Sequence, residues 1–203
     1  MKLNTLIIAL GILFSVQAQE KEREGWFIGM GAGISYFSFE TSWQMNGLQY
    51  GGSLPNMQFG KMLNARSAIL VNLPGTIYRF GGSGRERDRG FEGIIPTYQT
   101  WLYKRWWAQL GFGLGMDAPA FYDIKNESER RFLFGPALLA GSGVEVVRKA
   151  YFSLDFSARY FWAKTLFGSD ESELVVPSMK GHTISVLVSG RFYLHKKNDP
   201  NHD

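Results

Sequence analysis

The stretch YFSLDFSARYFW, residues 151–162, alternates between two kinds of side chain with a period of two. One set is apolar and consists of Phe152, Leu154, Phe156, Ala158, Tyr160 and Trp162. The other set carries an acid and a base and consists of Tyr151, Ser153, Asp155, Ser157, Arg159 and Phe161. Because successive side chains of a strand point to opposite faces, this stretch predicts a strand with one apolar and one polar face. The apolar face either packs into a soluble core or contacts lipid.

The composition suits a single strand-rich domain. The chain has 203 residues, of which 15% are aromatic, 20% are charged and 24 are glycines. It has no cysteine, so packing and backbone hydrogen bonds must stabilise it without disulfides. When the first eighteen residues, which include Lys2, are set aside, the chain has 21 basic and 18 acidic residues. A net charge of +3 is too small to indicate nucleic-acid binding.

The first eighteen residues, MKLNTLIIALGILFSVQA, have the pattern of a secretory signal peptide. Lys2 precedes an apolar run over residues 6–14, and the modest side chains that end at Ala18 fit a cleavage site, so the mature chain is expected to start at Gln19. The apolar run is too short to span a membrane as a helix, and no longer run follows it.

Alternation predicts eight strands joined by links of two lengths. The strands cover residues 26–39, 53–63, 67–80, 93–103, 106–116, 132–147, 151–162 and 182–194. The links at 63–67, 104–105 and 148–149 are tight turns, whereas those at 40–52, 81–92, 117–131 and 163–181 are long. Short and long links therefore alternate, as they do in membrane barrels with short periplasmic turns and long outer loops.

Aromatic residues gather at both ends of the predicted strands. At the short-turn end these are Trp26, Trp101, Tyr103, Trp106, Trp107, Phe152, Phe192 and Tyr193. At the long-link end they are Tyr36, Phe39, Tyr78, Phe80, Phe132, Phe134, Tyr160 and Trp162. Amphipathic rings collect at membrane interfaces, so the pattern predicts two aromatic girdles.

Glycines recur at every second residue in GMGAG, residues 29–33, and in GFGLG, residues 111–115. A nucleotide-binding loop would need a following helix, so these glycines are predicted to thin the inner face of a narrow barrel. Prolines inside the predicted strands imply bulges or strand ends, at Pro55, Pro74, Pro96 and Pro136.

The predicted fold is all-β, an eight-stranded antiparallel up-and-down transmembrane barrel over residues 26–194. On its signal, strand number, link lengths and girdles, the chain resembles the small eight-stranded bacterial outer-membrane barrels of the OmpA and OmpX kind. The resemblance implies a place in a Gram-negative outer membrane, with residues 19–25 and the polar tail 195–203 in the periplasm. It also implies that the last strand, which ends in GRFYL at 190–194, engages the barrel assembly machinery.

Four charged side chains are predicted to face the lumen, namely Glu145, Asp155, Arg159 and Arg191. An unpaired charge in so narrow an interior would be costly, so we expect the four to pair directly or through water. Such a network would close the barrel to solutes, because eight strands enclose little more than their own side chains.

The links also predict which residues lie side by side. The tight turn at 148–149 sets Glu145 opposite Phe152, and the long link 163–181 sets Asp155 level with Ser189. Arg191 would then lie within a residue or two of both acids.

The mixed-charge stretch RERDR, residues 85–89, is either a solvated loop or a contact with lipopolysaccharide phosphates through Arg85, Arg87 and Arg89. We expect outer-membrane lipid as the surroundings, a monomer, no nucleic-acid partner, and neither metal nor other cofactor.

A structural, adhesive or surface-interaction role without catalysis is the predicted function. One alternative is an outer-leaflet lipid-modifying enzyme that combines His182 with Ser178 or Ser185 and an acid such as Glu173. Another is a soluble periplasmic barrel that binds an apolar ligand, with charges outside and an apolar lumen.

Overall fold

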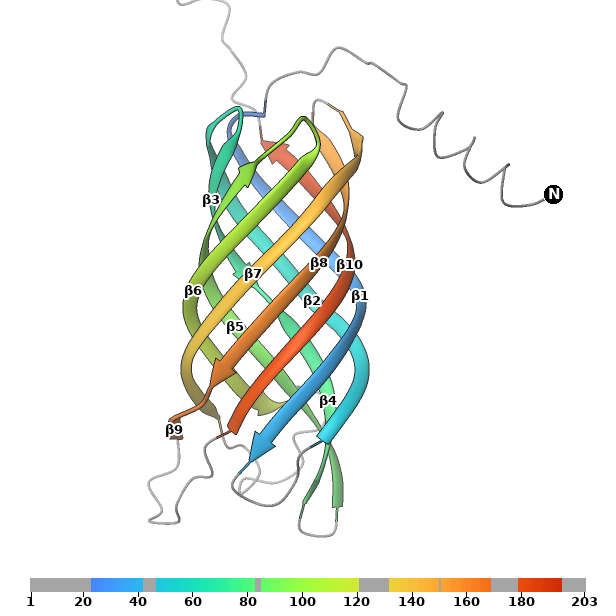
Figure 1. Cartoon of the computed structure of the whole chain (residues 1–203), viewed down its shortest axis with the longest axis vertical. Coiled ribbons are helices and arrows are strands. Elements are labelled where there is room, and N and C mark those ends of the chain that lie inside the picture. Colours follow the sequence, from blue (N-terminus) through green and yellow to red (C-terminus); the bar gives the residue numbers. More distant parts are fainter. Residues whose placement is uncertain are drawn as a thin grey trace, which may run out of the picture.

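The computed structural model describes residues 23–41, 47–82, 85–120, 132–149, 151–168 and 179–194, which form one long barrel of tilted strands (Figure 1). Its strands are β1 Trp26–Thr41, β2 Gly47–Asn64, β3 Ser67–Leu73, β4 Gly75–Gly82, β5 Arg85–Trp101, β6 Trp106–Pro119, β7 Leu133–Arg148, β8 Phe152–Lys164, β9 Phe167–Gly168 and β10 Met179–Leu194. No helix long and apolar enough to cross a membrane occurs within this described part of the chain.

The sheet closes on itself as an eight-stranded antiparallel barrel. Strand pairing runs β3-β2-β1-β10-β8-β7-β6-β5-β4, and β3 also pairs with β5, which closes the ring. β3 and β4 are consecutive parts of one barrel strand, because both pair with β5, while β9 only adds two residues beside β7. The first and last strands join from Trp26↔Leu194 to Thr41↔Met179. The predicted fold class is therefore confirmed.

Prolines mark two irregular places in the barrel wall. Pro74 separates β3 from β4, and Pro55 lies where the β1–β2 register shifts opposite Gly31 and Gly33. Pro136 lies one residue before the β7–β8 ladder ends at Ala137, but Pro96 keeps its place in the ladder opposite Val71. The prediction of bulges or strand ends is thus wrong for Pro96.

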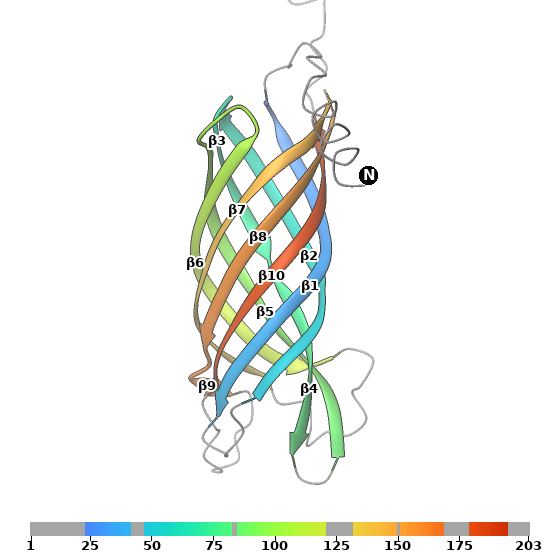
Figure 2. The same cartoon turned by 45° about the vertical axis from the view of Figure 1, so that its right-hand side comes forward.

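The link predicted at 81–92 is not a loop. β4 and β5 pair from Gly75↔Glu92 to Gly82↔Arg85 and form a hairpin that extends past the rim of the barrel (Figures 1 and 2). Tyr78 and Phe91 at its base are buried in the lumen. The glycines and mixed charges of residues 81–90 do not alternate between apolar and polar, so the sequence pattern did not indicate strands there. The other long links are shorter than predicted, since β1, β2, β6, β8 and β10 each extend into them.

In residues 152–162 the side chains alternate between lumen and exterior as predicted, whereas Tyr151, which was predicted to face inward, is 62% exposed just before β8. Ser153, Asp155, Ser157 and Arg159 are buried in the barrel, whereas Phe156 is 54% exposed on the outside. The same exterior carries large apolar side chains on many strands, including Ile28, Met30, Ile34, Leu110, Phe112, Val186 and Val188. An apolar outer face favours the membrane barrel over the soluble barrel.

The two predicted aromatic girdles are only partly on the outside. Several of their members are buried in the barrel instead, namely Trp101, Trp107, Tyr193, Phe39 and Tyr78. Neighbours along a strand must face opposite ways, so Trp106 is 48% exposed while Trp107 is fully buried. The prediction is wrong for these five residues, and their burial fills the lumen.

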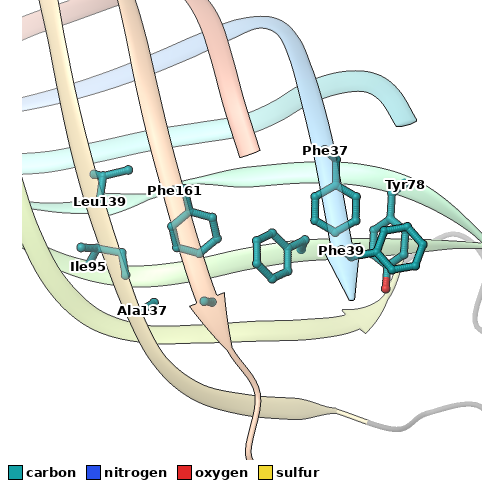
Figure 3. Close-up of a cluster of buried hydrophobic side chains, with 9 residues drawn as sticks. Phe37, Phe39, Tyr78, Ile95, Ala137, Leu139 and Phe161 are labelled. Carbon is teal, nitrogen blue, oxygen red and sulfur yellow. The ribbon is translucent and has the colours of Figure 1, made fainter. Parts of the chain in front are cut away.

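Buried apolar side chains form two clusters inside the barrel. The cluster at the long-link end of the lumen, called the outer cluster, contains Phe37, Phe39, Tyr78, Phe91, Ile95, Ala137, Leu139, Phe161 and Ala163 (Figure 3). The inner cluster, at the short-turn end, contains Phe27, Met62, Ala68, Leu70, Trp101, Trp107 and Tyr193. Glycines on the inner face make room for these side chains, since a Cβ on Gly115 would lie 2.3 Å from the Cβ of Ala163.

Candidate functional site

The candidate site is the charged layer of the lumen next to the inner cluster. It is built on β7, β8 and β10, which are neighbours in the barrel wall and turn alternate residues inward. Glu145, Asp155 and Arg191 are fully buried, and Arg159 is 3% exposed. All four charged residues predicted from the sequence thus lie inside the barrel.

Arg191 and Asp155 form the central ion pair of this layer, with Arg191 Nε 3.1 Å from Asp155 Oδ2. The same Nε donates to Gln58 Oε1 at 3.1 Å, and the guanidinium carbon lies 5.0 Å from the ring centroid of Trp107. Trp107 Nε1 donates to Asp155 Oδ1 at 3.4 Å. Charge pairing and aromatic contact together offset part of the cost of burying this guanidinium.

Glu145 pairs with Arg23, a residue that precedes β1. Arg23 donates from Nη2 to Glu145 Oε2 at 2.6 Å and from Nε to Oε1 at 3.1 Å. Trp101 Nε1 donates to the same Oε1 at 3.0 Å, and the Arg23 guanidinium lies 4.3 Å from the Trp101 ring. Arg23 also donates to the carbonyls of Ala65 and Lys104 in two short turns. Its side chain therefore links Glu145 to two turns at the short-turn end of the barrel.

The register of these strands corrects one prediction and confirms another. Glu145 lies opposite Asp155 rather than Phe152, because the β7–β8 ladder begins at Arg148↔Ser153, which is a wider turn than predicted, and then shifts by one residue between Glu145 and Val147. A bulge of one residue cannot be read from the alternation before it. Asp155 lies level with Ser189 as predicted.

A third ion pair with a buried acid lies toward the long-link end. Asp117 Oδ1 accepts hydrogen bonds from Tyr78 Oη at 2.8 Å and from Arg89 Nε at 3.0 Å. Of the three arginines predicted to contact phosphates, Arg89 therefore has its guanidinium paired with Asp117 at the long-link end of the lumen. Arg85 and Arg87 belong to the part of β5 that pairs with β4 in the projecting hairpin.

His182 and Ser185 do not form a catalytic pair. His182 is half-buried on the outer face, 5.9 Å from Tyr160 between ring centroids, whereas Ser185 is buried in the lumen and bonds to Ser35. Odd and even residues of β10 face opposite sides, so the two side chains cannot meet. Ser178 and Glu173 lie outside the described residues. Within the described ranges, no cluster of metal-ligating side chains occurs.

Sequence reasoning missed Arg23, Trp101, Gln58 and Gln109 as lumen residues. Alternation could have placed Gln58 and Gln109, since each shares the face of inward-pointing glycines on its strand. No pattern marks Arg23, because it lies outside the strands and reaches Glu145 across 122 residues of chain.

Neither a protein-family model nor a curated protein sequence matches this chain. Solved structures do match its fold. Neisserial surface protein A (NspA) is similar with a TM-score of 0.57 and 15% identity, over 84% of this chain and 97% of that one. The attachment invasion locus protein Ail of Yersinia pestis is similar with a TM-score of 0.51 and 14% identity, over 83% of this chain and 99% of that one.

Proposed function

Because this chain has the eight-stranded barrel fold of small bacterial outer-membrane proteins, we propose that it spans such a membrane and acts through its outer surface rather than as a pore. Both chain termini would then lie on the periplasmic side, together with the short turns. Ail is an attachment invasion locus protein, and the role proposed for this chain is of the same surface-contact class.

The observation that carries this proposal is the filled lumen. Two apolar clusters occupy it, together with the charged layer and many buried polar side chains. The fully buried side chains include Trp107, Phe27, Phe37, Phe91 and Arg191, which are among the largest in the barrel. An eight-stranded barrel is only wide enough for its own side chains, so a lumen filled in this way has no room for a steady aqueous channel.

The projecting β4–β5 hairpin is the element proposed to make the surface contact. It extends past the rim at the end opposite the short turns (Figures 1 and 2), which would be outside the cell in this orientation. Arg79 of β4 has a side chain that is 64% exposed, and Arg85 and Arg87 lie on the β5 half of the hairpin. Arginine forks match phosphate geometry, so lipopolysaccharide phosphates are the proposed contact.

Binding to lipopolysaccharide tests the surface role. Purified barrel in detergent would be titrated with lipopolysaccharide, using wild type and the double variant Arg85→Gln and Arg87→Gln. The matched control is Arg66→Gln with Lys104→Gln, which removes two exposed charges at the opposite end. We expect the hairpin variant to bind several-fold more weakly and the control to bind as wild type does. Equal binding by all three proteins would contradict the contact.

Planar-bilayer recording tests the filled lumen separately. We expect no large, long-lived channels from the purified wild-type protein, and at most small, intermittent conductance as the lumen ion pairs rearrange. Steady channels of general-porin size would overturn the pore-free interpretation whatever the hairpin binds.

A further inference from the structure

Arg159 is a buried charge in the described lumen that has no partner. Each of the three buried acids already has an arginine partner, in the pairs Arg23–Glu145, Arg191–Asp155 and Arg89–Asp117. In contrast, Nε, Nη1 and Nη2 of Arg159 make no hydrogen bond to any described residue. The side chain is only 3% exposed, so bulk water does not solvate it either. An isolated buried guanidinium is costly, since arginine keeps its charge in proteins.

A second unpartnered donor lies near the stem of the Arg159 side chain. Asn72 Nδ2 donates to Gln109 Oε1 at 3.4 Å, which orients the Gln109 amide and leaves its Nε2 without an acceptor. A Cβ on Gly141 would lie 3.0 Å from Gln109 Nε2 and 3.1 Å from Arg159 Cγ, so both side chains pass over this glycine. Ser157, the next inward residue on β8, also has a hydroxyl without a partner. The group is rich in donors, and Asp155, the acid whose charge reaches Arg159, already pairs with Arg191.

These donors lie between an apolar layer and an ion-paired layer. Arg159 of β8 lies opposite Gly141 of β7. The next pair along these strands whose side chains point into the lumen is Phe161 and Leu139 of the outer cluster. On the other side lie the Arg191–Asp155 pair and Trp107. A charge held in such surroundings attracts a counter-ion far more strongly than it would in water.

We propose that Arg159 and Gln109 bind a small monovalent anion of the halide class inside the barrel. The guanidinium and the amide offer only N–H donors to this position, and a hydroxyl such as that of Ser157 can turn to donate as well. One excess positive charge matches one negative charge, and a lumen this narrow disfavours phosphate or sulfate on size and charge. This inference is independent of the proposed surface role.

Anomalous diffraction from crystals grown in bromide tests the proposal on the unaltered protein. We expect an anomalous peak within hydrogen-bonding distance of the Arg159 guanidinium and Gln109 Nε2. Ordered water at that position without anomalous signal, or bromide bound only elsewhere, would overturn it.

Chloride dependence of unfolding tests the same site in solution. In urea titrations at constant ionic strength, exchanging gluconate for chloride should raise the unfolding midpoint of wild type, because a ligand that binds only the folded state stabilises it. The Arg159→Met variant should lose this shift, and the surface control Lys61→Met should keep it. If Arg159→Met does not fold, Gln109→Leu takes its place and should show a reduced shift. A wild type with the same midpoint in both salts would contradict the proposal.

Discussion

Arg23 Nη2 lies 2.6 Å from Glu145 Oε2, although 122 residues separate the two along the chain. Arg23 precedes the first strand and Glu145 lies on β7, so the contact spans the mouth of the barrel rather than following one ladder. The side chains are 6% and 0% exposed. This pair ties the start of the barrel to its far wall, and its energetic weight can be measured.

Arg23→Met should destabilise the barrel by about 3–5 kcal/mol, because it leaves the Glu145 carboxylate buried without its cation. The measurement is urea unfolding of protein refolded into lipid vesicles. Lys180→Met is the control, since Lys180 and Glu40 form an exposed pair at 3.7 Å whose loss should cost less than about 1 kcal/mol. Similar small losses in both variants would mean that Arg23 is not held in the mouth.

Gly115→Ala should lose about 1–3 kcal/mol of stability through overpacking in the outer cluster. The added methyl would lie 2.3 Å from the Cβ of Ala163, so removal of that second methyl should relieve the clash. We therefore expect the double variant Gly115→Ala with Ala163→Gly to lose less than the sum of the two single losses. Strict additivity in the same unfolding assay would show that the two side chains do not meet in the lumen.

Ile34→Arg and Tyr103→Arg test which part of the barrel exterior contacts lipid and which part contacts water. The two side chains are similarly exposed, at 73% and 70%, but Ile34 lies in the middle of β1 and Tyr103 in a short turn. In vesicles, arginine should cost about 2–4 kcal/mol at the depth of Ile34 and about 0–1 kcal/mol at Tyr103. If both substitutions were nearly neutral, the apolar exterior would not face lipid.

Arg79→Cys and Lys104→Cys test which end of the barrel lies outside the cell. The chain has no cysteine, so each variant offers one thiol to a membrane-impermeant maleimide added to whole cells. We expect Arg79→Cys in the hairpin to be labelled and Lys104→Cys in the short turn to react only after the cells are broken. Labelling of Lys104→Cys alone on intact cells would invert the proposed orientation.

Sequence alternation predicted the strand faces, and together with the alternating link lengths it predicted an eight-stranded architecture. The period of two in residues 151–162 is a local property, because each peptide unit turns the next side chain to the opposite face. It therefore placed Asp155 and Arg159 inside and Phe156 outside correctly. The same rule could have placed Trp107 in the lumen, since Trp106 before it faces outward.

Only the tertiary structure decided which lumen charges pair. Glu145 meets Arg23 rather than a partner on its own or a neighbouring strand, and Arg159 has no partner among the described residues. A bulge next to Val147 shifts the register by one residue, which moves Glu145 level with Asp155. Alternation fixes the side of the sheet to which a residue points. The neighbour it meets depends on register and on ring closure between distant segments, which no local pattern encodes.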